Sequence, residues 1–556
     1  MTSPFLLARR HALGAALALA FAMDAGALAP ATELQACAYD GQPVGLAAAG
    51  LRAAGAGGAR LVADIMKFTG LPQNFAVLEH PKVPNAAAVI TLGPDRLPKR
   101  VIAYNPDFIA LVERATDGNR WAPVSVMAHE VGHHLSGHTI QPGGSQPPTE
   151  LEADTFSGFV LYKMGASLSD AQQALQALVP EADGRTHPGR SKRVQAVAQG
   201  WRQACLQQGG DCGGEARALA AASSSAAPAT PASNAAENPP ALASRGAPAT
   251  TPAPSTTIAP APSGGVGADR LPRPDADAIP AKFDRFVYDA FGVLDADERA
   301  RVEREMFQLA QATGVEIVTL LVDSLHGMSA QDYAYAMLRQ LRVGKLDVGN
   351  GALVVVAPNE QQVAIAMGPG LILENRGMTD VDLGRLRNFL THGWPWCIKN
   401  GNCAGWTQNF FGASEHLAAS AKHWEWGIRY QSLDEITQTY QQAVQARRET
   451  GARYDPDQDP TWRKIARIDA TVASLDPARS HPDAFVNASH QRNVGPAVLL
   501  HTGAGAPVML YVHPQVQALM PAGALREGRR YQFVARESSL ANATPQFDLL
   551  SYDRVD

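Results

Sequence analysis

The sequence predicts a multidomain α+β protein, and three observations carry this prediction. The chain has 556 residues, which is several times the usual length of a domain. A stretch of Ala, Pro, Ser and Thr with almost no charge, at about 217–268, separates an N-terminal part from a C-terminal part. Hydrophobic residues recur with helical and strand-like periods on both sides of this stretch.

Composition disfavours two classes of function. The 48 Lys and Arg against 53 Asp and Glu give a formal net charge of −5, so no basic excess is present and no nucleic-acid partner is expected. Five cysteines without a CxxC pair disfavour a Cys-ligated zinc or a thioredoxin-like site. A metal site in this chain should therefore use His and carboxylate ligands.

Residues 1–29 have the pattern of a secretory signal peptide. Two arginines precede an apolar stretch, 12–23, and small residues follow it, so cleavage is expected after Ala27 or Ala29. The apolar stretch is shorter than the roughly 20 residues that a membrane span needs, and no later segment is long and apolar enough. We therefore expect a periplasmic or secreted protein with no transmembrane segment in the mature chain.

Export also permits disulfides. Cys397 and Cys403 are the expected local pair, and Cys37 is expected to join Cys205 or Cys212. A lipoprotein-type box ending at Cys37 and a twin-arginine signal are alternative readings of the N-terminus.

Shifts in composition divide the chain into six segments. They are the signal peptide (1–29), a domain with the metal motif described below (30–212), a flexible Ala/Pro/Ser/Thr linker (213–282), an α/β domain with a Trp- and Cys-containing insertion (283–414), a helical segment (415–475) and a small all-β module (476–556). In the α/β domain, a strand at 315–322 lies between two helices, and 352–357 should pair with 363–367.

The segment 121–138, WAPVSVMAHEVGHHLSGH, predicts an amphipathic helix with chemistry on one side. Pro123 suits the first turn, and apolar residues recur at helical spacing through the segment. His129 and His133 then lie one turn apart on the same side, where two imidazoles can share a zinc ion. Glu130 is placed to accept a proton from a water molecule at that ion.

A catalytic zinc takes three protein ligands, so one more is needed. The metzincin pattern is excluded because Ser136 and Thr139 stand where its Gly and third His belong. The alternative is a carboxylate from a following helix, and 148–156, PTELEADTF, predicts one. Thr149 is the expected N-cap of this helix.

Two glutamates of this second helix are candidates for the third ligand. Glu150 lies in the first turn, and Asp154 lies one turn later on the same face, where it can hold a ligating histidine by its other nitrogen. Glu152 is the rival ligand, but it points about 200° away around the helix.

Three ordered motifs make the N-terminal domain resemble the CAAX-prenyl-protease and HtpX-like gluzincins, metallopeptidase family 48. The motifs are HEVGHHLSGH (129–138), ELEAD (150–154) and Thr186-His187-Pro188 followed by Arg193. The resemblance covers roughly residues 85–201 and implies a gluzincin-like zinc peptidase fold. It implies one Zn²⁺ ion with three ligands, His129, His133 and Glu150.

The same resemblance gives roles to other residues. Glu130 is implied as the catalytic base, and His187 and Arg193 are implied to stabilise the oxyanion or to gate the zinc. Side chains of this kind suit a developing negative oxygen. The alternative is a structural zinc, closed by a fourth ligand from His134 or His138.

Two strand candidates, 85–90 and 101–105, precede the zinc helix and should form a hairpin. In gluzincins an edge strand pairs with the substrate backbone, and we expect one of these strands either to do so or to be an ordinary part of the core.

The middle of the chain, 285–375, resembles a TPM domain of the thylakoid-lumen phosphatase and levamisole-receptor-modulator type. The resemblance rests on DAFGVLDADE (289–298), GNGALVVVAP (349–358) and VAIAMGPGL (363–371). It implies links with Ca²⁺ and phosphatase activity, with Asp289 as a candidate Ca²⁺ ligand. The residues themselves favour turns and capping, with Asp295 as N-cap of a helix that Gly314 ends.

The C-terminal module, with its short strands between Gly and Pro turns, loosely resembles an OB-like barrel. No aromatic residues are interleaved with its arginines, so we expect it to serve protein contact or packing.

The sequence thus predicts an exported zinc metalloendopeptidase that hydrolyses envelope or misfolded proteins, with protein or peptide substrates. The TPM-like module is expected to recruit substrate or an envelope protein partner. Two alternatives differ in class. One is an envelope binding or scaffold protein with an inactive or structural zinc unit, and the other is a calcium-dependent phosphatase whose turnover survives Glu130→Gln.

Overall fold

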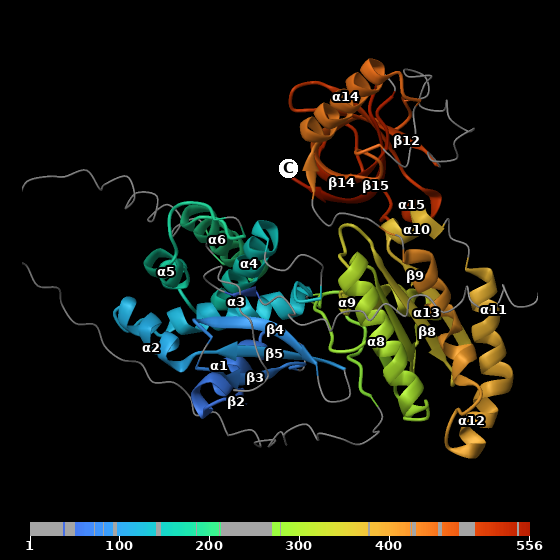
Figure 1. Cartoon of the computed structure of the whole chain (residues 1–556), viewed down its shortest axis with the longest axis horizontal. Coiled ribbons are helices and arrows are strands. Elements are labelled where there is room, and N and C mark those ends of the chain that lie inside the picture. The colour runs from blue at the N-terminus through green and yellow to red at the C-terminus, as the bar shows by residue number, and fades with distance from the viewer. Residues whose placement is uncertain are drawn as a thin grey trace, which may run out of the picture.

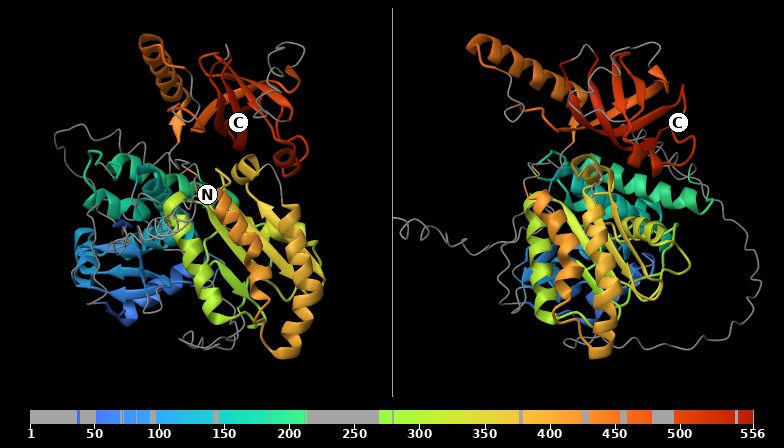
Figure 2. Two further views of the ribbon diagram at one scale, coloured as in Figure 1. Left: turned by 45° about the vertical axis from the view of Figure 1, so that its right-hand side comes forward. Right: turned by 90° about the vertical axis from the view of Figure 1, so that its right-hand side faces the viewer.

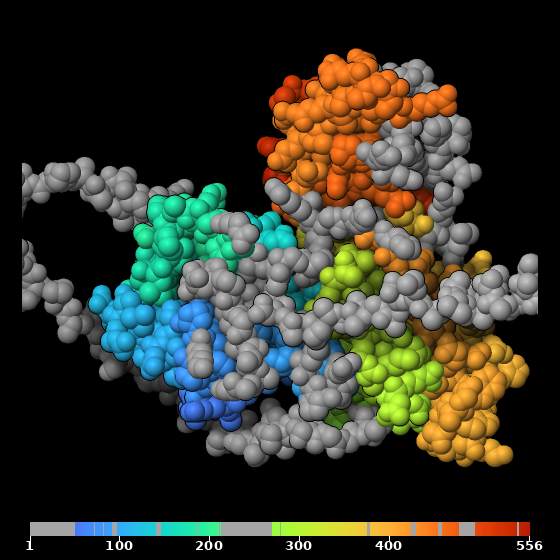
Figure 3. Space-filling view, in the orientation of Figure 1, coloured from blue at the N-terminus to red at the C-terminus, as the bar shows by residue number. Residues whose placement is uncertain are grey.

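The computed structural model describes residues 37–38, 51–140, 146–210, 212, 269–375, 379–422, 424, 430–453, 459–477, 495–541 and 544–555, with gaps at 70, 72, 82, 93–96, 185 and 279. The predicted signal peptide and residues 213–268 of the predicted linker lie outside this part. The described residues form three units with separate sheets (Figure 1), and Figure 3 gives a space-filling view in the same orientation. The part of the chain so described contains no helix both long and apolar enough to cross a bilayer.

The N-terminal unit is built on a five-stranded sheet of order β1-β4-β5-β3-β2. The strands are β1 (Cys37–Ala38), β2 (Arg52–Ala53), β3 (Ala76–Glu79), β4 (Ala86–Leu92) and β5 (Pro98–Tyr104). The expected hairpin is β4 and β5, which pair antiparallel with Ala88 opposite Ile102. Since β5 lies between β4 and β3, only β4 of the two is near an edge, where β1 pairs with it.

The described helices of this unit (Figure 1) are α1 (Ala56–Met66), α2 (Pro106–Ala115), α3 (Trp121–Ser136), α4 (Pro147–Lys163), α5 (Leu168–Leu178) and α6 (Arg190–Gln207). α3 packs between the sheet and α4, and its apolar residues Val126, Met127 and Val131 are in the core. Nearly every residue of α3 is buried, including its polar ones, so those polar side chains require partners inside the protein.

Two glycines let α4 and α6 approach at backbone distance. A Cβ on Gly158 would lie 2.0 Å from the Val197 carbonyl oxygen, and one on Gly200 would lie 1.8 Å from that of Thr155. No other residue type fits at such a contact. The close approach brings the first turns of α4 and α6 together beside α3.

The middle unit has a four-stranded sheet of order β6-β7-β8-β9. The strands are β6 (Val287–Asp289), β7 (Glu316–Leu321), β8 (Gly351–Ala357) and β9 (Gln362–Met367), and only the β8–β9 pair is antiparallel. The helices are α8 (Ala296–Thr313), α9 (Ala330–Gln340), α10 (Pro369–Asn375), α11 (Asp380–Asn388), α12 (Trp394–Asn400) and α13 (Thr407–Ala421), with a π-helical turn, η1 (Phe389–Gly393), between α11 and α12. α13 lies between α8 and α11 (Figure 2).

The helix ends, the hairpin and the disulfide of the middle unit are those predicted from the sequence. The Asp295 carboxylate caps α8 by accepting from the backbone N–H groups of Asp297 and Glu298, and Gly314 ends the helix with a φ of 76°. The pairing of Val356 with Val363 confirms the expected β8–β9 hairpin. The predicted Cys397–Cys403 disulfide is present in the insertion.

The C-terminal unit comprises β10 (Gln431–Ser432), α14 (Leu433–Thr450), β11 (Ile465–Ser474), β12 (Ala497–Thr502), β13 (Pro507–Tyr511), α15 (Pro514–Ala518), β14 (Arg530–Ser539) and β15 (Gln546–Arg554). Five strands close on themselves in the order β11-β12-β13-β15-β14, because β11 also pairs with β14. β11 therefore belongs to the closed sheet, although its residues fall in the predicted helical segment, 415–475.

Three sequence expectations need correction. Cys205 is bonded to Cys212, so neither is joined to Cys37 as expected. α4 begins at Pro147 with Gln146 as its N-cap, so Thr149 is not the cap; it lies in the first turn and accepts from the Gln146 backbone N–H. Residues 269–282, which were expected to be linker, contact the folded units: the Ala281 backbone bonds Gln340, and Asp269 pairs with Arg285.

Candidate metal centre

Three buried side chains from two helices converge on one point. His129 Nε2 lies 3.0 Å from His133 Nε2, while the Glu150 carboxylate lies 3.3 Å from the first nitrogen and 3.5 Å from the second. α3 supplies the histidines one turn apart, and α4 supplies the glutamate in its first turn, as the spacing predicts. Within the described residues, this is the group of His, Cys and acidic side chains with metal-ligand geometry.

The donor set fits a zinc ion. Four ligands at about 2.0–2.1 Å in a tetrahedron lie roughly 3.3 Å apart, which matches the three separations here. Both Glu150 oxygens are buried without a hydrogen-bond partner, a costly arrangement for a carboxylate. Burial opposes ionisation of Glu150, but His133 and His129 together hold its pKa well below the usual range. An anionic Glu150 beside two imidazoles is a suitable set for a divalent cation.

The outer nitrogen of His129 is held by a buried ion pair. The Asp154 carboxylate lies 2.8 Å from His129 Nδ1, and Arg193 donates to both Asp154 oxygens at 2.7 and 2.8 Å. Asp154 thus has the supporting position predicted for it, which leaves Nε2 of His129 facing the other donors. Arg193 comes from the first turn of α6, behind the metal ligands, and two of its donors are used by Asp154.

Glu130 follows His129 on α3 and faces the sheet. Its Oε2 accepts the backbone N–H of Ala88 on β4 at 2.8 Å, and its Oε1 is buried without a hydrogen-bond partner. Burial raises the pKa of Glu130 to about 7, although His129 and His133 oppose the rise. The carboxylate is therefore fixed by one oxygen and presents the other.

His187 lies on the other side of the donor set. Its Nε2 is 3.3 Å from Glu150 Oε2, and the Thr186 hydroxyl lies 2.9 Å from its Nδ1. The imidazole is held at Nδ1 and directed with Nε2 toward the ligands. His187 is thus next to the centre, as expected, and the Arg193 guanidinium also reaches it, with one nitrogen 4.0 Å from Glu150 Oε2.

The two other histidines of the motif are not among the converging donors. His134 points to the sheet, where its Nε2 lies 3.0 Å from the Val101 carbonyl oxygen and its ring stacks on Phe75. His138 lies 3.0 Å from the outer nitrogen of His133, and its own Nε2 lies 3.1 Å from the rival ligand Glu152. Neither supplies a fourth ligand in this structure, so the geometry favours a three-ligand site.

In the middle unit, the candidate Ca²⁺ ligand Asp289 accepts hydrogen bonds from backbone N–H groups. One Asp289 oxygen accepts from the N–H groups of Phe291 and Gly292, and the other accepts from Leu294. This placement favours the turn-forming role of Asp289 over a Ca²⁺ ligand. Within the described residues, no cluster of metal-ligand type occurs in this unit.

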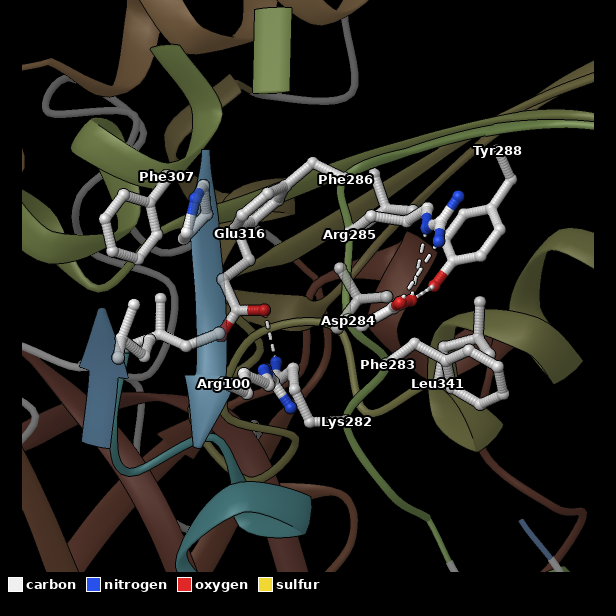
Figure 4. Close-up of a pocket in the computed structure, with 15 residues that line it drawn as sticks. Arg100, Lys282, Phe283, Asp284, Arg285, Phe286, Tyr288, Phe307, Glu316 and Leu341 are labelled. Atoms are coloured by element: carbon white, nitrogen blue, oxygen red, sulfur yellow. Dashed lines mark hydrogen bonds and ion pairs between the residues drawn. The ribbon is translucent and has the colours of Figure 1, made fainter. Parts of the chain in front are cut away.

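The sequence did not indicate how the middle unit meets the metal centre. Arg342, between α9 and β8, forms an ion pair with Glu152 of α4, 190 residues away along the chain. The Lys282 backbone N–H donates to the Leu135 carbonyl in the last turn of α3, and the Lys282 ammonium pairs with Glu316. Lys282, Glu316 and Arg100 line a small cavity of about 20 Å³ at this junction. Figure 4 shows the three side chains close together. No sequence pattern links residues so far apart.

Comparison with known proteins identifies one of the three units. Residues 287–387 match the family model of the TPM domain, which includes β6 to α11. No curated protein matches the chain. A solved structure, the N-terminal domain of a protein from P. gingivalis determined by NMR, is 20% identical and covers 26% of this chain and 88% of that one, with a TM-score of 0.21. The chain thus contains a TPM domain.

Proposed function

We propose that the N-terminal unit is a gluzincin-like zinc metalloendopeptidase that hydrolyses peptide bonds of exported proteins. One observation carries the proposal: Glu130 directly follows the candidate ligand His129 on α3 and keeps a buried Oε1 without a hydrogen-bond partner, while Ala88 fixes its Oε2. A structural zinc site needs four protein ligands and has no use for such a carboxylate.

Separate side chains are proposed to bind the metal and to transfer protons. Zinc, when bound by His129, His133 and Glu150, supplies a Lewis acid that polarises the scissile carbonyl and acidifies water. Glu130 accepts a proton at Oε1 as the water oxygen bonds to the carbonyl carbon, and passes it to the leaving nitrogen as the C–N bond breaks.

His187 is the proposed donor to the oxyanion. Its Nε2 is at the edge of the donor set, and the contact of its Nδ1 with Thr186 fixes the ring. A donor fixed before the reaction stabilises the developing negative charge without reorganising. Arg193 is better suited to holding Asp154, and through it His129, than to contacting substrate.

β4 is the proposed substrate strand. It is near the sheet edge, and its Ala88 directly contacts the base. An extended peptide pairing with β4 would bring its carbonyl groups alongside Glu130. β1 already pairs there, with Cys37 opposite Ala88, so a substrate that pairs with β4 has to displace β1.

The other two units are proposed to recruit proteins. The TPM domain docks on the peptidase unit, and the closed barrel contacts the TPM domain through Arg536, which binds Glu374 of α10 at 2.6 Å. The strand order of the barrel and its parallel β13–β15 pair support the proposal of an OB-like fold. The disulfides Cys205–Cys212 and Cys397–Cys403 support export to the periplasm or the medium.

The test is cleavage of casein by the chain without residues 1–29, loaded with zinc, beside Glu130→Gln. The expected result is a rate at least about 100-fold lower for the variant, because it lacks the general base. Glu113→Gln, an exposed change on α2, is the matched control and should cleave as the parent does.

Zinc content must be equal in all three proteins. Zinc bound in each without cleavage by the parent would overturn the endopeptidase proposal and favour a binding or scaffold function. Turnover of a phosphate ester that survives Glu130→Gln would favour the phosphatase alternative.

A further inference from the structure

The two histidines of the centre are supported from different places. Asp154 and Arg193, which hold His129, belong to the same unit as the ligand. The residues behind His133 form a series that leaves this unit and ends in the TPM domain. We propose that Arg342 of the TPM domain is a positioning residue for the zinc site and acts on His133 through Glu152 and His138. This inference rests on the proposed zinc centre.

The first contact joins two imidazoles. His133 Nδ1 lies 3.0 Å from His138 Nδ1, and the rings meet edge-on with an interplanar angle of 73°. A histidine that binds a metal through Nε2 carries its proton on Nδ1. His133 therefore donates, and His138 accepts at its own Nδ1.

The next contacts follow from that assignment. His138 then carries its proton on Nε2, which lies 3.1 Å from Glu152 Oε2, a carboxylate oxygen that can only accept. The other oxygen, Oε1, accepts from the Arg342 guanidinium. The imidazole donations thus run from His133 through His138 to Glu152, and the Arg342 guanidinium donates to the same carboxylate from the other side, so the four side chains form one connected set.

Arg342 is itself held at the junction of the two units. Its backbone has a φ of 47°, in the left-handed region that few arginines adopt, and its carbonyl accepts from Lys282. Lys282 also donates its backbone N–H to the carbonyl of Leu135, which is two residues after His133 on α3. The docking of the TPM domain thus sets where the guanidinium meets Glu152.

The Glu152–Arg342 pair is better suited to orientation than to stability. The Glu152 side chain is 36% exposed and that of Arg342 is 19% exposed, and ion pairs open to solvent contribute little to folding. Groups that orient metal ligands, in contrast, change metal affinity by about 10–100-fold when removed. The expected effect of breaking the pair is therefore on the metal and not on the fold.

The test uses the chain without residues 1–29 and the metal alone. Zinc dissociation constants are measured by chelator competition for the parent, Arg342→Gln, Glu152→Gln and the double variant. We expect affinity to fall about 10-fold for Glu152→Gln and about threefold for Arg342→Gln. The double variant should be no weaker than Glu152→Gln, because both residues act through one series.

Arg339→Gln is the matched control, since Arg339 lies on α9 and donates to the Ala278 carbonyl. Its zinc affinity should equal that of the parent, and Arg342→Lys should restore part of the loss. The visible spectrum of the Co²⁺-loaded proteins gives a second readout, and its bands should shift for Glu152→Gln and Arg342→Gln but not for Arg339→Gln.

Equal zinc affinities and Co²⁺ spectra for Arg342→Gln and Arg339→Gln would overturn the inference, as would additive losses in the double variant. These results are separate from cleavage. A parent that binds zinc without cleaving casein contradicts the proposed function and leaves the positioning role open to the same measurement. If Arg342→Gln does not fold, Glu152→Gln decides the question, and an unchanged spectrum there overturns the inference.

Discussion

Buried carboxylates occur in both the N-terminal unit and the TPM domain, but they are satisfied differently. In the TPM domain, Asp289 receives three backbone N–H groups and Glu303 receives those of Phe286 and Val287. In the N-terminal unit, Glu150 has no hydrogen-bond partner, and Glu130 has one at a single oxygen. Backbone N–H groups thus saturate Asp289 and Glu303, whereas Glu130 and Glu150, the proposed base and metal ligand, each keep an oxygen available.

The sharpest way to break this comparison is to remove the charge of Glu150. Glu150→Gln replaces an anionic ligand of a buried cation by a neutral amide, so zinc affinity should fall by more than about 100-fold. Chelator competition measures the change. Glu303→Gln is the matched control, because that glutamate is equally buried but outside the centre, and its zinc affinity should remain that of the parent.

A second variant tests the saturated carboxylate. Asp289→Ala leaves three backbone N–H groups without their acceptor, so the TPM domain should lose roughly 3 kcal/mol of stability. Calorimetry of the intact chain gives the change in its unfolding transition. Addition of Ca²⁺ should stabilise neither protein, and stabilisation of the parent alone would restore Asp289 as a calcium ligand.

The smallest expected effect concerns pH. Burial raises the pKa of Glu303 to about 7, against the pull of the Phe286 and Val287 N–H groups. Between its unfolded pKa, near 4.5, and about 7, the unfolded chain has lost this proton while the folded chain keeps it. The contribution of Glu303 to stability therefore falls as pH rises through this window, by at most about 3 kcal/mol.

Thermal unfolding of the parent and Glu303→Gln at pH 5 and pH 8 measures this effect. The stability of the parent relative to Glu303→Gln should be greater at pH 5 than at pH 8. An equal stability difference at the two pH values would mean that Glu303 is ionised at both. Glu305→Gln, an exposed change on the same helix, should show no pH-dependent difference.

Much of the centre follows from local spacing. His129 and His133 are one helical turn apart, as are Glu150 and Asp154, and each pair lies on one helix. The TPM domain could be recognised because its capping and hairpin signals are also local. Contacts that depend on how helices meet could not be predicted, and the approach of α4 to α6 through Gly158 and Gly200 is one of them.

The errors have the same origin. Thr149 and Gln146 are both able to cap a helix, and two prolines after Gln146 allow the helix to begin earlier than expected. The Cys205–Cys212 bond depends on a turn at the end of α6 and not on spacing alone. Arg342 and Glu152 are joined only by the docking of two units, so neither carries a signal in the sequence.

The junction between the units has a practical consequence for a chain that carries a long Ala- and Pro-rich stretch. Residues 281–282 bond to Gln340 and Leu135, and Asn74 donates to the Lys282 carbonyl. These contacts hold the N-terminal unit and the TPM domain together independently of residues 213–268. A nick in that stretch would therefore yield two fragments that elute as a single species on a sizing column and separate only in denaturant.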